Sequence, residues 1–293
     1  MDFSLNSEQE LLQKEIIRFA QKELNGDVIA NDRAQHFPKE NWDKCAEMGL
    51  MGLPVSSEFG GAELDGISTA AALEGLGYGS RDGGVNFSVC AHLLACVVPV
   101  WKFADSHLQE KYLKQLSTGK AIAVNATTEP EAGSDIFTMK TTAKPADGGF
   151  VLNGTKTFAT NAPVADLALV YAATDSEKGF FGGITAFIVE KAEAGFRIGQ
   201  RFEKMGLRTS PIGELIFEDV FVSSENVVGQ TGQGGAIFNY SMQWERAGIA
   251  ALHVGTMQRL LETAAGYAKN RRQGGQVIGK HQDFVSRFIT FQR

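Results

Sequence analysis

The sequence has few cysteines and no concentrated run of basic residues. Its three cysteines, Cys45, Cys90 and Cys96, form no C-x-x-C pair, and its five histidines have no metal-ligand spacing, so we expect neither a disulfide framework nor a metal site. A formal charge of −6 without a Lys/Arg cluster argues against nucleic acid and against an anionic membrane surface as partners. The acidity indicates no more than solubility.

The sequence also lacks targeting and membrane-spanning segments. Its N-terminus has neither the basic region nor the apolar core of a signal peptide, and it carries Asp2, Glu8, Glu10 and Glu15, which a mitochondrial transit peptide would avoid. The longest apolar run, residues 90–101, contains a histidine and a proline and is too short to cross a bilayer. The sequence therefore predicts a cytoplasmic protein.

The pattern of apolar residues predicts helices, then strands, then helices. A capping box at Ser7 to Glu10 opens the first helix, and residues 68–79, 85–103 and 106–117 are expected to be helical. Strands are expected at 167–171, 184–189 and 214–222, with hairpin turns at Asp147-Gly148 and Asn153-Gly154. Residues 236–269 and those after Gly279 return to a helical pattern.

This order predicts an α+β multidomain protein. An N-terminal all-helical domain covers 1–120, an antiparallel β-barrel or sandwich covers 121–230, and a C-terminal helical domain covers 231–293. No G-x-G-x-x-G or G-x-x-x-x-G-K-[ST] string is present, so a Rossmann or P-loop nucleotide site has no support.

A pair of hydroxyls before a glycine-centred turn is the first candidate binding element. Thr127 and Thr128 can each donate a hydrogen bond, Gly133 lets the backbone approach a ligand, and Ser134 can offer its hydroxyl and N–H to an anion. This suits a flat, polar ligand. The same composition is also typical of a turn without a ligand.

Glu245 is the candidate catalytic residue. It falls at helical spacing on a stripe with Phe238, Met242, Ile249 and Leu252, where burial would raise the pKa of its carboxyl toward the range that a general base needs. The pattern equally allows a surface-facing glutamate or one paired with a cation such as its neighbour Arg246.

Four strings in this order resemble signatures of the acyl-CoA dehydrogenase family, whose flavoenzymes desaturate acyl thioesters between the α and β carbons. Residues 128–135 read T-E-P-E-A-G-S-D, 156–162 read K-T-F-A-T-N-A, 204–210 read K-M-G-L-R-T-S, and Trp244-Glu245-Arg246 precedes Arg271 and His281-Gln282. The resemblance implies three domains, with FAD between the β-domain and the last helical domain. Family members carry a further C-terminal helical segment, so the final domain is expected to be truncated and to leave apolar surface uncovered.

The resemblance also implies roles for the matched residues. It places Thr127 and Thr128 at the isoalloxazine edge and Ser134 near the phosphate or thioester. Phe158 and Thr160 are placed at the flavin face and rim, although Phe158 stands where many members have tryptophan and would otherwise be read as a strand core residue.

Two further residues are matched in the C-terminal domain. Arg271 matches an arginine that reaches a neighbouring subunit's FAD pyrophosphate, but Gly274 replaces the aromatic residue that accompanies it in the family. Gln282 matches a cofactor-binding glutamine of the same region, with a plain surface role as the alternative. A homotetramer is implied.

The resemblance also assigns Glu245 and Arg246 to catalysis, as in isovaleryl-CoA and long-chain acyl-CoA dehydrogenases. Glu245 would remove the α-proton while the β-hydrogen passes as hydride to flavin N5. Acyl-CoA is the first substrate choice, with electron-transferring flavoprotein or oxygen as acceptor. Gln243 replaces an aspartate that holds the CoA arm in several members, so an acyl or aminoacyl carrier protein, as in prolyl-carrier-protein dehydrogenases, is the alternative. A flavin oxidase or monooxygenase, and a fragment acting only in assembly, remain two further alternatives.

Overall fold

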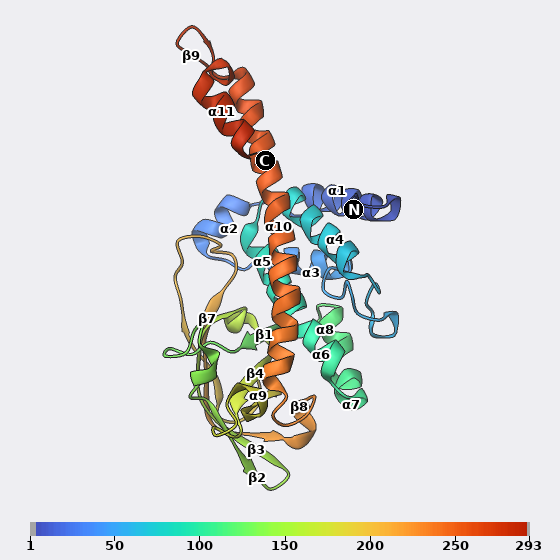
Figure 1. The fold of residues 1–293 in the computed structure, drawn as a ribbon, viewed down its shortest axis with the longest axis vertical. Coiled ribbons are helices and arrows are strands. Elements are labelled where there is room, and N and C mark those ends of the chain that lie inside the picture. Colours follow the sequence, from blue (N-terminus) through green and yellow to red (C-terminus); the bar gives the residue numbers. More distant parts are fainter. Residues whose placement is uncertain (1–3, 292–293) are drawn as a thin grey trace.

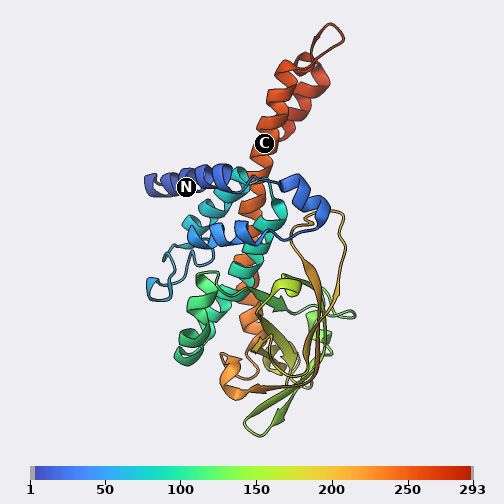
Figure 2. The same cartoon turned by 180° about the vertical axis from the view of Figure 1, so that it is seen from behind.

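The computed structural model describes residues 4–291, in which a block of helices and a β-sheet lie along one long helix, α10 (Gly234–Asn270) (Figure 1). The view from behind shows the N-terminal helices and the sheet as two bodies, one beyond the other along α10 (Figure 2). The upper part of α10 extends past both bodies and carries the last helix, α11 (Gln282–Phe291). The expected order of helices, sheet and helices is confirmed.

The N-terminal block contains short helices around an apolar core. Its α-helices are α1 (Ser7–Glu23), α2 (Val28–Ala34), α3 (Lys39–Glu47), α4 (Gly66–Gly79), α5 (Gly83–His92), α6 (Val98–Phe103), α7 (Ser106–Leu108) and α8 (Lys114–Ser117). The capping box of α1 lies one residue earlier than the sequence predicts: Asn6 Oδ1 accepts from Gln9 N at 2.9 Å, and Gln9 Oε1 accepts from Asn6 N at 3.0 Å.

One long helical segment fills the centre of this block. Helix α5, a π-helical turn at Leu93–Val97 and helix α6 follow one another without a break. Among the described residues this segment, Gly83–Phe103, is long and apolar enough to cross a membrane. The expectation that the apolar run at residues 90–101 is too short to do so is therefore corrected, because the helix extends beyond that run at both ends. However, 89% of its apolar window is buried by the rest of the protein. It is therefore the core helix of the block.

The middle of the chain forms a mostly antiparallel sheet with strand order β6-β7-β3-β2-β4-β5-β8. The strands are β1 (Ala123–Ala126), β2 (Thr142–Ala146), β3 (Gly149–Thr160), β4 (Leu167–Ala173), β5 (Ile184–Glu190), β6 (Phe196–Arg201), β7 (Ile212–Ser223) and β8 (Val227–Val228), with the short helix α9 (Phe180–Gly183) before β5. Strand β1 runs parallel to β4 and aligns Asn125 with Leu169, so the sheet is not purely antiparallel as expected.

Only one of the two predicted hairpin turns is present. Asp147-Gly148 joins β2 to β3, as predicted, with Gly148 at φ 72°. The Asn153-Gly154 turn is wrong, because both residues lie inside β3 at a β-bulge where the pairing with β7 shifts register. Gly154 is required there, since its φ is 151° and a Cβ would overlap Thr141.

Helix α10 is held close to the N-terminal block by glycines. A Cβ at Gly77 of α4 would overlap the carbonyl of Leu252, and a Cβ at Gly255 would overlap the carbonyl of Glu74. Gly248 faces the side chain of Leu94 in the π-helical turn. These contacts fix the position of α10, and therefore of Glu245, against the helical block.

The end of the chain presents the uncovered apolar surface that the sequence predicts. After α10, strands β9 (Arg272–Gln273) and β10 (Gln276–Val277) form a small hairpin that leads to α11. Helices α10 and α11 enclose an open groove lined mainly by apolar side chains, namely Val254, Met257, Leu260, Leu261, Phe284 and Phe288.

Candidate functional site

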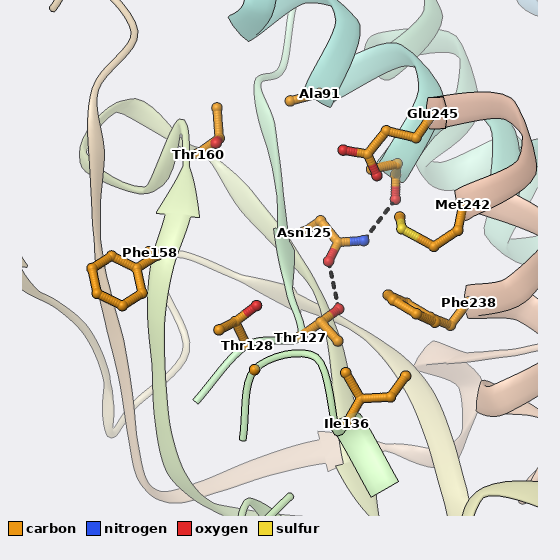
Figure 3. Close-up of a pocket in the computed structure, with 12 residues that line it drawn as sticks. Ala91, Asn125, Thr127, Thr128, Ile136, Phe158, Thr160, Phe238, Met242 and Glu245 are labelled. Carbon is orange, nitrogen blue, oxygen red and sulfur yellow. Dashed lines mark hydrogen bonds between the residues drawn. The ribbon is translucent and has the colours of Figure 1, made fainter. Parts of the chain in front are cut away.

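A cavity of about 230 Å³ lies between the sheet and α10. From the sheet side it is lined by Asn125, Thr127, Thr128, Phe158 and Thr160, together with the turn after β1. From the helical side it is lined by Ala91, Ala95, Phe238, Met242 and Glu245. Figure 3 shows Phe158 and Glu245 on opposite sides of the view, with Thr127, Thr128 and Asn125 between them.

The structure brings together five of the nine residues assigned from the sequence. Thr127, Thr128, Phe158, Thr160 and Glu245 all line the cavity. The cavity is also lined by residues that the sequence did not single out. Among these, Asn125 alone has a polar side chain.

The other four assigned residues lie outside the cavity. Ser134 is exposed in the turn next to Gly133, and Arg246 is exposed on α10 beside Glu245. Arg271 and Gln282 lie at the far end of α10, where the small hairpin and α11 stand apart from the sheet (Figure 1). Arg271 follows Glu245 by 26 positions, which corresponds to about 39 Å along a helix. Neither residue lines this chain's own cavity.

A buried ion pair joins the first two motifs. Lys156 Nζ lies 2.8 Å from Glu129 Oε1 and donates to the carbonyl of Thr127 at 3.0 Å, and both charged side chains are buried. The Glu129 carboxylate also accepts the backbone N–H groups of Lys140 and Thr141. Burial lowers the pKa of Lys156 to about 8, while the Glu129 charge acts in the opposite direction. The pair anchors the turn that carries the cavity's threonines.

Phe158 has a strained backbone. Its φ is 53°, in the left-handed region that bulky residues rarely adopt, and it lies where the pairing of β3 with β7 shifts register between Lys156 and Ala159. Phe158 is 61% exposed, and its ring lies against that of Phe202 with 5.0 Å between the ring centroids. Phe158 is therefore not a strand core residue, and its position leaves an aromatic face available at the cavity mouth.

Asn125 is held by two hydrogen bonds. Its Nδ2 donates to the carbonyl of Ala95 at 3.0 Å, and its Oδ1 accepts from the hydroxyl of Thr127 at 2.5 Å (Figure 3). Thr127 is buried, whereas Thr128 is partly exposed and its carbonyl accepts from the N–H of Thr157 at 2.8 Å. The hydroxyl hydrogen of Thr127 therefore points to Asn125, and of these two threonines it is Thr128 that keeps its hydroxyl hydrogen for a ligand.

Glu245 is a partly buried carboxylate beside apolar neighbours. Burial raises the pKa of its carboxyl, and the charge of Arg246 acts in the opposite direction without reversing the shift. Met242 and Phe238 precede it by three and seven positions on the same face of α10. A carboxylate with a raised pKa in a cavity is suited to act as a general base.

The hydrogen-bonding groups that line the cavity suit the ring of a flavin. Thr128 and Thr160 present hydroxyls, Gly133 has open space where a Cβ would lie, and the aromatic ring of Phe158 stands at the mouth. Such groups suit the carbonyl and nitrogen edge of a flat heterocycle. Within the described residues no group of three or more histidine, cysteine or acidic side chains could hold a metal ion.

Comparisons with known proteins identify similar chains over the full length. Models of the acyl-CoA dehydrogenase N-terminal, middle and C-terminal domains match residues 6–120, 125–220 and 232–293. An L-prolyl-[peptidyl-carrier protein] dehydrogenase of Serratia sp. (strain ATCC 39006) is 46% identical over 292 residues, which cover 100% of this chain and 75% of that protein.

Two solved structures are similar in fold as well as in sequence. The structure "PigA with FAD and proline" has a TM-score of 0.97 at 45% identity, with 100% of this chain and 76% of that chain covered. The "Prolyl Acyl Carrier Protein Oxidase AnaB" has a TM-score of 0.95 at 43% identity, with 99% and 76% covered.

Proposed function

Because this chain belongs to the acyl-CoA dehydrogenase family, we propose that it is an FAD-dependent oxidoreductase that desaturates an aminoacyl group, such as prolyl, bound as a thioester to a carrier protein. The similarity over the whole chain to a prolyl-carrier-protein dehydrogenase and to two structures whose titles name proline or a prolyl carrier protein supports this substrate. These similarities favour the carrier-protein alternative over acyl-CoA, which the sequence places first.

The observation that carries the reaction type is Glu245 in the cavity. Its carboxylate would take the α-proton of the thioester, since burial keeps its pKa raised and makes it a stronger base than an exposed glutamate. Bound FAD would supply the acceptor for the β-hydrogen, which would leave as a hydride, so that loss of one proton and one hydride would form a carbon–carbon double bond. Thr128 and Thr160 would bind the flavin edge, Ser134 its phosphate side, and Phe158 its face.

We extend the proposal to the residues outside the cavity. Arg271 and Gln282 would contact FAD bound by a neighbouring subunit in a tetramer, which their distance from this chain's cavity supports. The charge of Arg246 would limit the rise in the pKa of Glu245 that burial causes. The electron acceptor would be electron-transferring flavoprotein or oxygen.

Cys45, Cys90 and Cys96 are buried free thiols, which supports the cytoplasm as the location.

A direct test is anaerobic addition of loaded carrier protein to the purified protein. We expect a yellow protein whose visible absorbance is bleached by a prolyl-loaded carrier and by no acyl-CoA at a comparable rate, because the product is reduced flavin. The same carrier loaded with glycine is the control, since glycine has no β-carbon from which a hydride could leave. Bleaching by butyryl-CoA alone would restore acyl-CoA as the substrate, and a protein that stays colourless with added FAD would contradict the flavin assignment.

The rate of bleaching should rise with pH. Glu245 acts as a base only when deprotonated, and its raised pKa keeps the proton on the carboxyl to a higher pH than in an ordinary glutamate. Activity is therefore gained as pH rises through this raised pKa. Stopped-flow measurement of the first turnover across pH would locate it. A midpoint at or below about 4.3, the ordinary glutamate value, would contradict a buried base.

A further inference from the structure

The orientation of the Asn125 side chain is determined by its partners. The carbonyl of Ala95 can only accept, so the amide group that faces it at 3.0 Å must be the Nδ2 donor. The Oδ1 atom therefore faces Thr127, and the Thr127 hydroxyl must donate to it. The two hydrogen bonds leave no freedom to exchange the nitrogen and oxygen of the amide.

The carbonyl of Ala95 is available because of the local helix geometry. Pro99, four residues later, has no N–H with which to close the ordinary α-helical hydrogen bond to this carbonyl. Ala95 also lies in the π-helical turn, a distortion frequent at functional sites. From the other side, the pairing of β1 with β4 fixes the backbone of Asn125 opposite Leu169. Both ends of the interaction are thus held by the fold.

The fixed orientation gives the substrate side of the cavity an excess of hydrogen-bond acceptors. Asn125 Oδ1 and Thr127 Oγ1 each keep a lone pair after their mutual hydrogen bond, and the Glu245 carboxylate adds further acceptors. The surrounding side chains of Phe238 and Met242 offer no strong donor. A saturated acyl chain offers no donor to these remaining lone pairs or to the Glu245 carboxylate, whereas a ligand with N–H groups does.

We propose that Asn125 is a specificity-determining residue whose Oδ1 accepts a hydrogen bond from the amine of an aminoacyl substrate. Thr127 is a positioning residue that acts through Asn125, because its donated hydrogen bond holds Oδ1 beside Thr127, and both residues line the cavity. This inference rests on the proposed desaturation of an aminoacyl thioester and names the group of the substrate that the cavity recognises.

The test compares two unreactive probes that differ in one group. L-Prolinamide carries the ring N–H, and cyclopentanecarboxamide has the same ring with CH₂ in its place. We expect the flavin-loaded protein to bind L-prolinamide at least about tenfold more tightly by calorimetry, and Asn125→Leu to lose most of that preference. Thr127→Val should weaken the preference, whereas Thr127→Ser, which keeps the hydroxyl, should retain it.

Equal affinity of the unmutated protein for the two probes would overturn the inference, as would a preference that Asn125→Leu leaves intact. The Thr127→Val and Thr127→Ser pair keeps the inference falsifiable if Asn125→Leu does not fold. The reaction itself is tested separately by bleaching with prolyl-loaded carrier protein. Absence of bleaching together with an Asn125-dependent preference would refute the reaction and support the amine site. Bleaching without such a preference would support the reaction and refute the amine site.

Discussion

Replacing Glu245 with glutamine is expected to leave flavin binding intact and to slow substrate-dependent bleaching by about 10²- to 10⁴-fold, the contribution typical of a general base. The carboxylate faces the cavity from α10, and glutamine has nearly the same shape but cannot take the α-proton. Anaerobic stopped-flow spectroscopy measures the loss, and the flavin-to-protein absorbance ratio shows that the cofactor is retained.

Glu262→Gln is the matched control, because it makes the same chemical change on the same helix. Glu262 accepts hydrogen bonds from Tyr78 and Gln258, and its pKa is lowered rather than raised, first by its hydrogen bond with Tyr78. It lies 17 positions beyond Glu245, about 25 Å along α10. Bleaching by Glu262→Gln should match the unmutated protein. If Glu245→Gln bleaches at the same rate as this control, Glu245 is not the base.

Local patterns predicted most of the fold. The central helices and the long helix α10 follow apolar periodicity, and the Asp147-Gly148 turn follows from its residue types. The placement of Glu245 on a stripe with Phe238 and Met242 followed from helical spacing alone. Nothing in the spacing distinguished a cavity-facing glutamate from a surface one, because that depends on which elements pack against α10.

The predictions failed where tertiary structure decides between similar local signals. Asn153-Gly154 has a hairpin composition, yet the pairing of β3 with β7 continues past it and absorbs it as a bulge. Asn6 and Ser7 are both good helix caps. In the structure Asn6 is the cap, because Gln9, three residues later, closes the capping box with it. Sequence-based reasoning had no means of weighing these alternatives.

The interactions that shape the cavity were missed for a related reason. Asn125 meets the carbonyl of Ala95, 30 positions earlier, and Lys156 meets Glu129, 27 positions earlier. Each pair forms only when separate elements come together. One signal was present in the sequence: Pro99 inside an apolar helical run leaves a carbonyl without its usual donor, which indicates that a side chain from another element satisfies it.

Lys156→Met is expected to lower the free energy of unfolding by about 3–5 kcal/mol, the usual cost of removing one partner of a buried ion pair. Burial on its own would raise the pKa of Glu129, and the Lys156 charge and the hydrogen bonds bring that pKa below its ordinary value instead. Without Lys156, burial dominates and the pKa of Glu129 in the folded protein rises above its value in the unfolded chain.

The pH dependence of this loss has a definite sign. With the raised pKa, folded Lys156→Met binds more protons than its unfolded chain at intermediate pH, so its stability falls as pH rises toward the new pKa of Glu129. The deficit relative to the unmutated protein should therefore be smaller at about pH 5 than at about pH 7. Denaturant unfolding followed by circular dichroism at both pH values measures it.

Two variants separate this charge effect from a general effect of the substitution. Lys140→Met removes an exposed lysine from the same loop and should change stability by less than about 0.5 kcal/mol. Adding Glu129→Gln to Lys156→Met should recover part of the loss, because glutamine removes the unpaired charge while its single oxygen can still accept one of the two N–H groups, those of Lys140 and Thr141, that the two carboxylate oxygens of Glu129 bind. A Lys156→Met protein as stable as Lys140→Met would show that the ion pair does not anchor the loop. Since this loop carries Thr128 and Gly133, a real loss of stability there should also weaken flavin binding, which connects the buried pair to the function of the cavity.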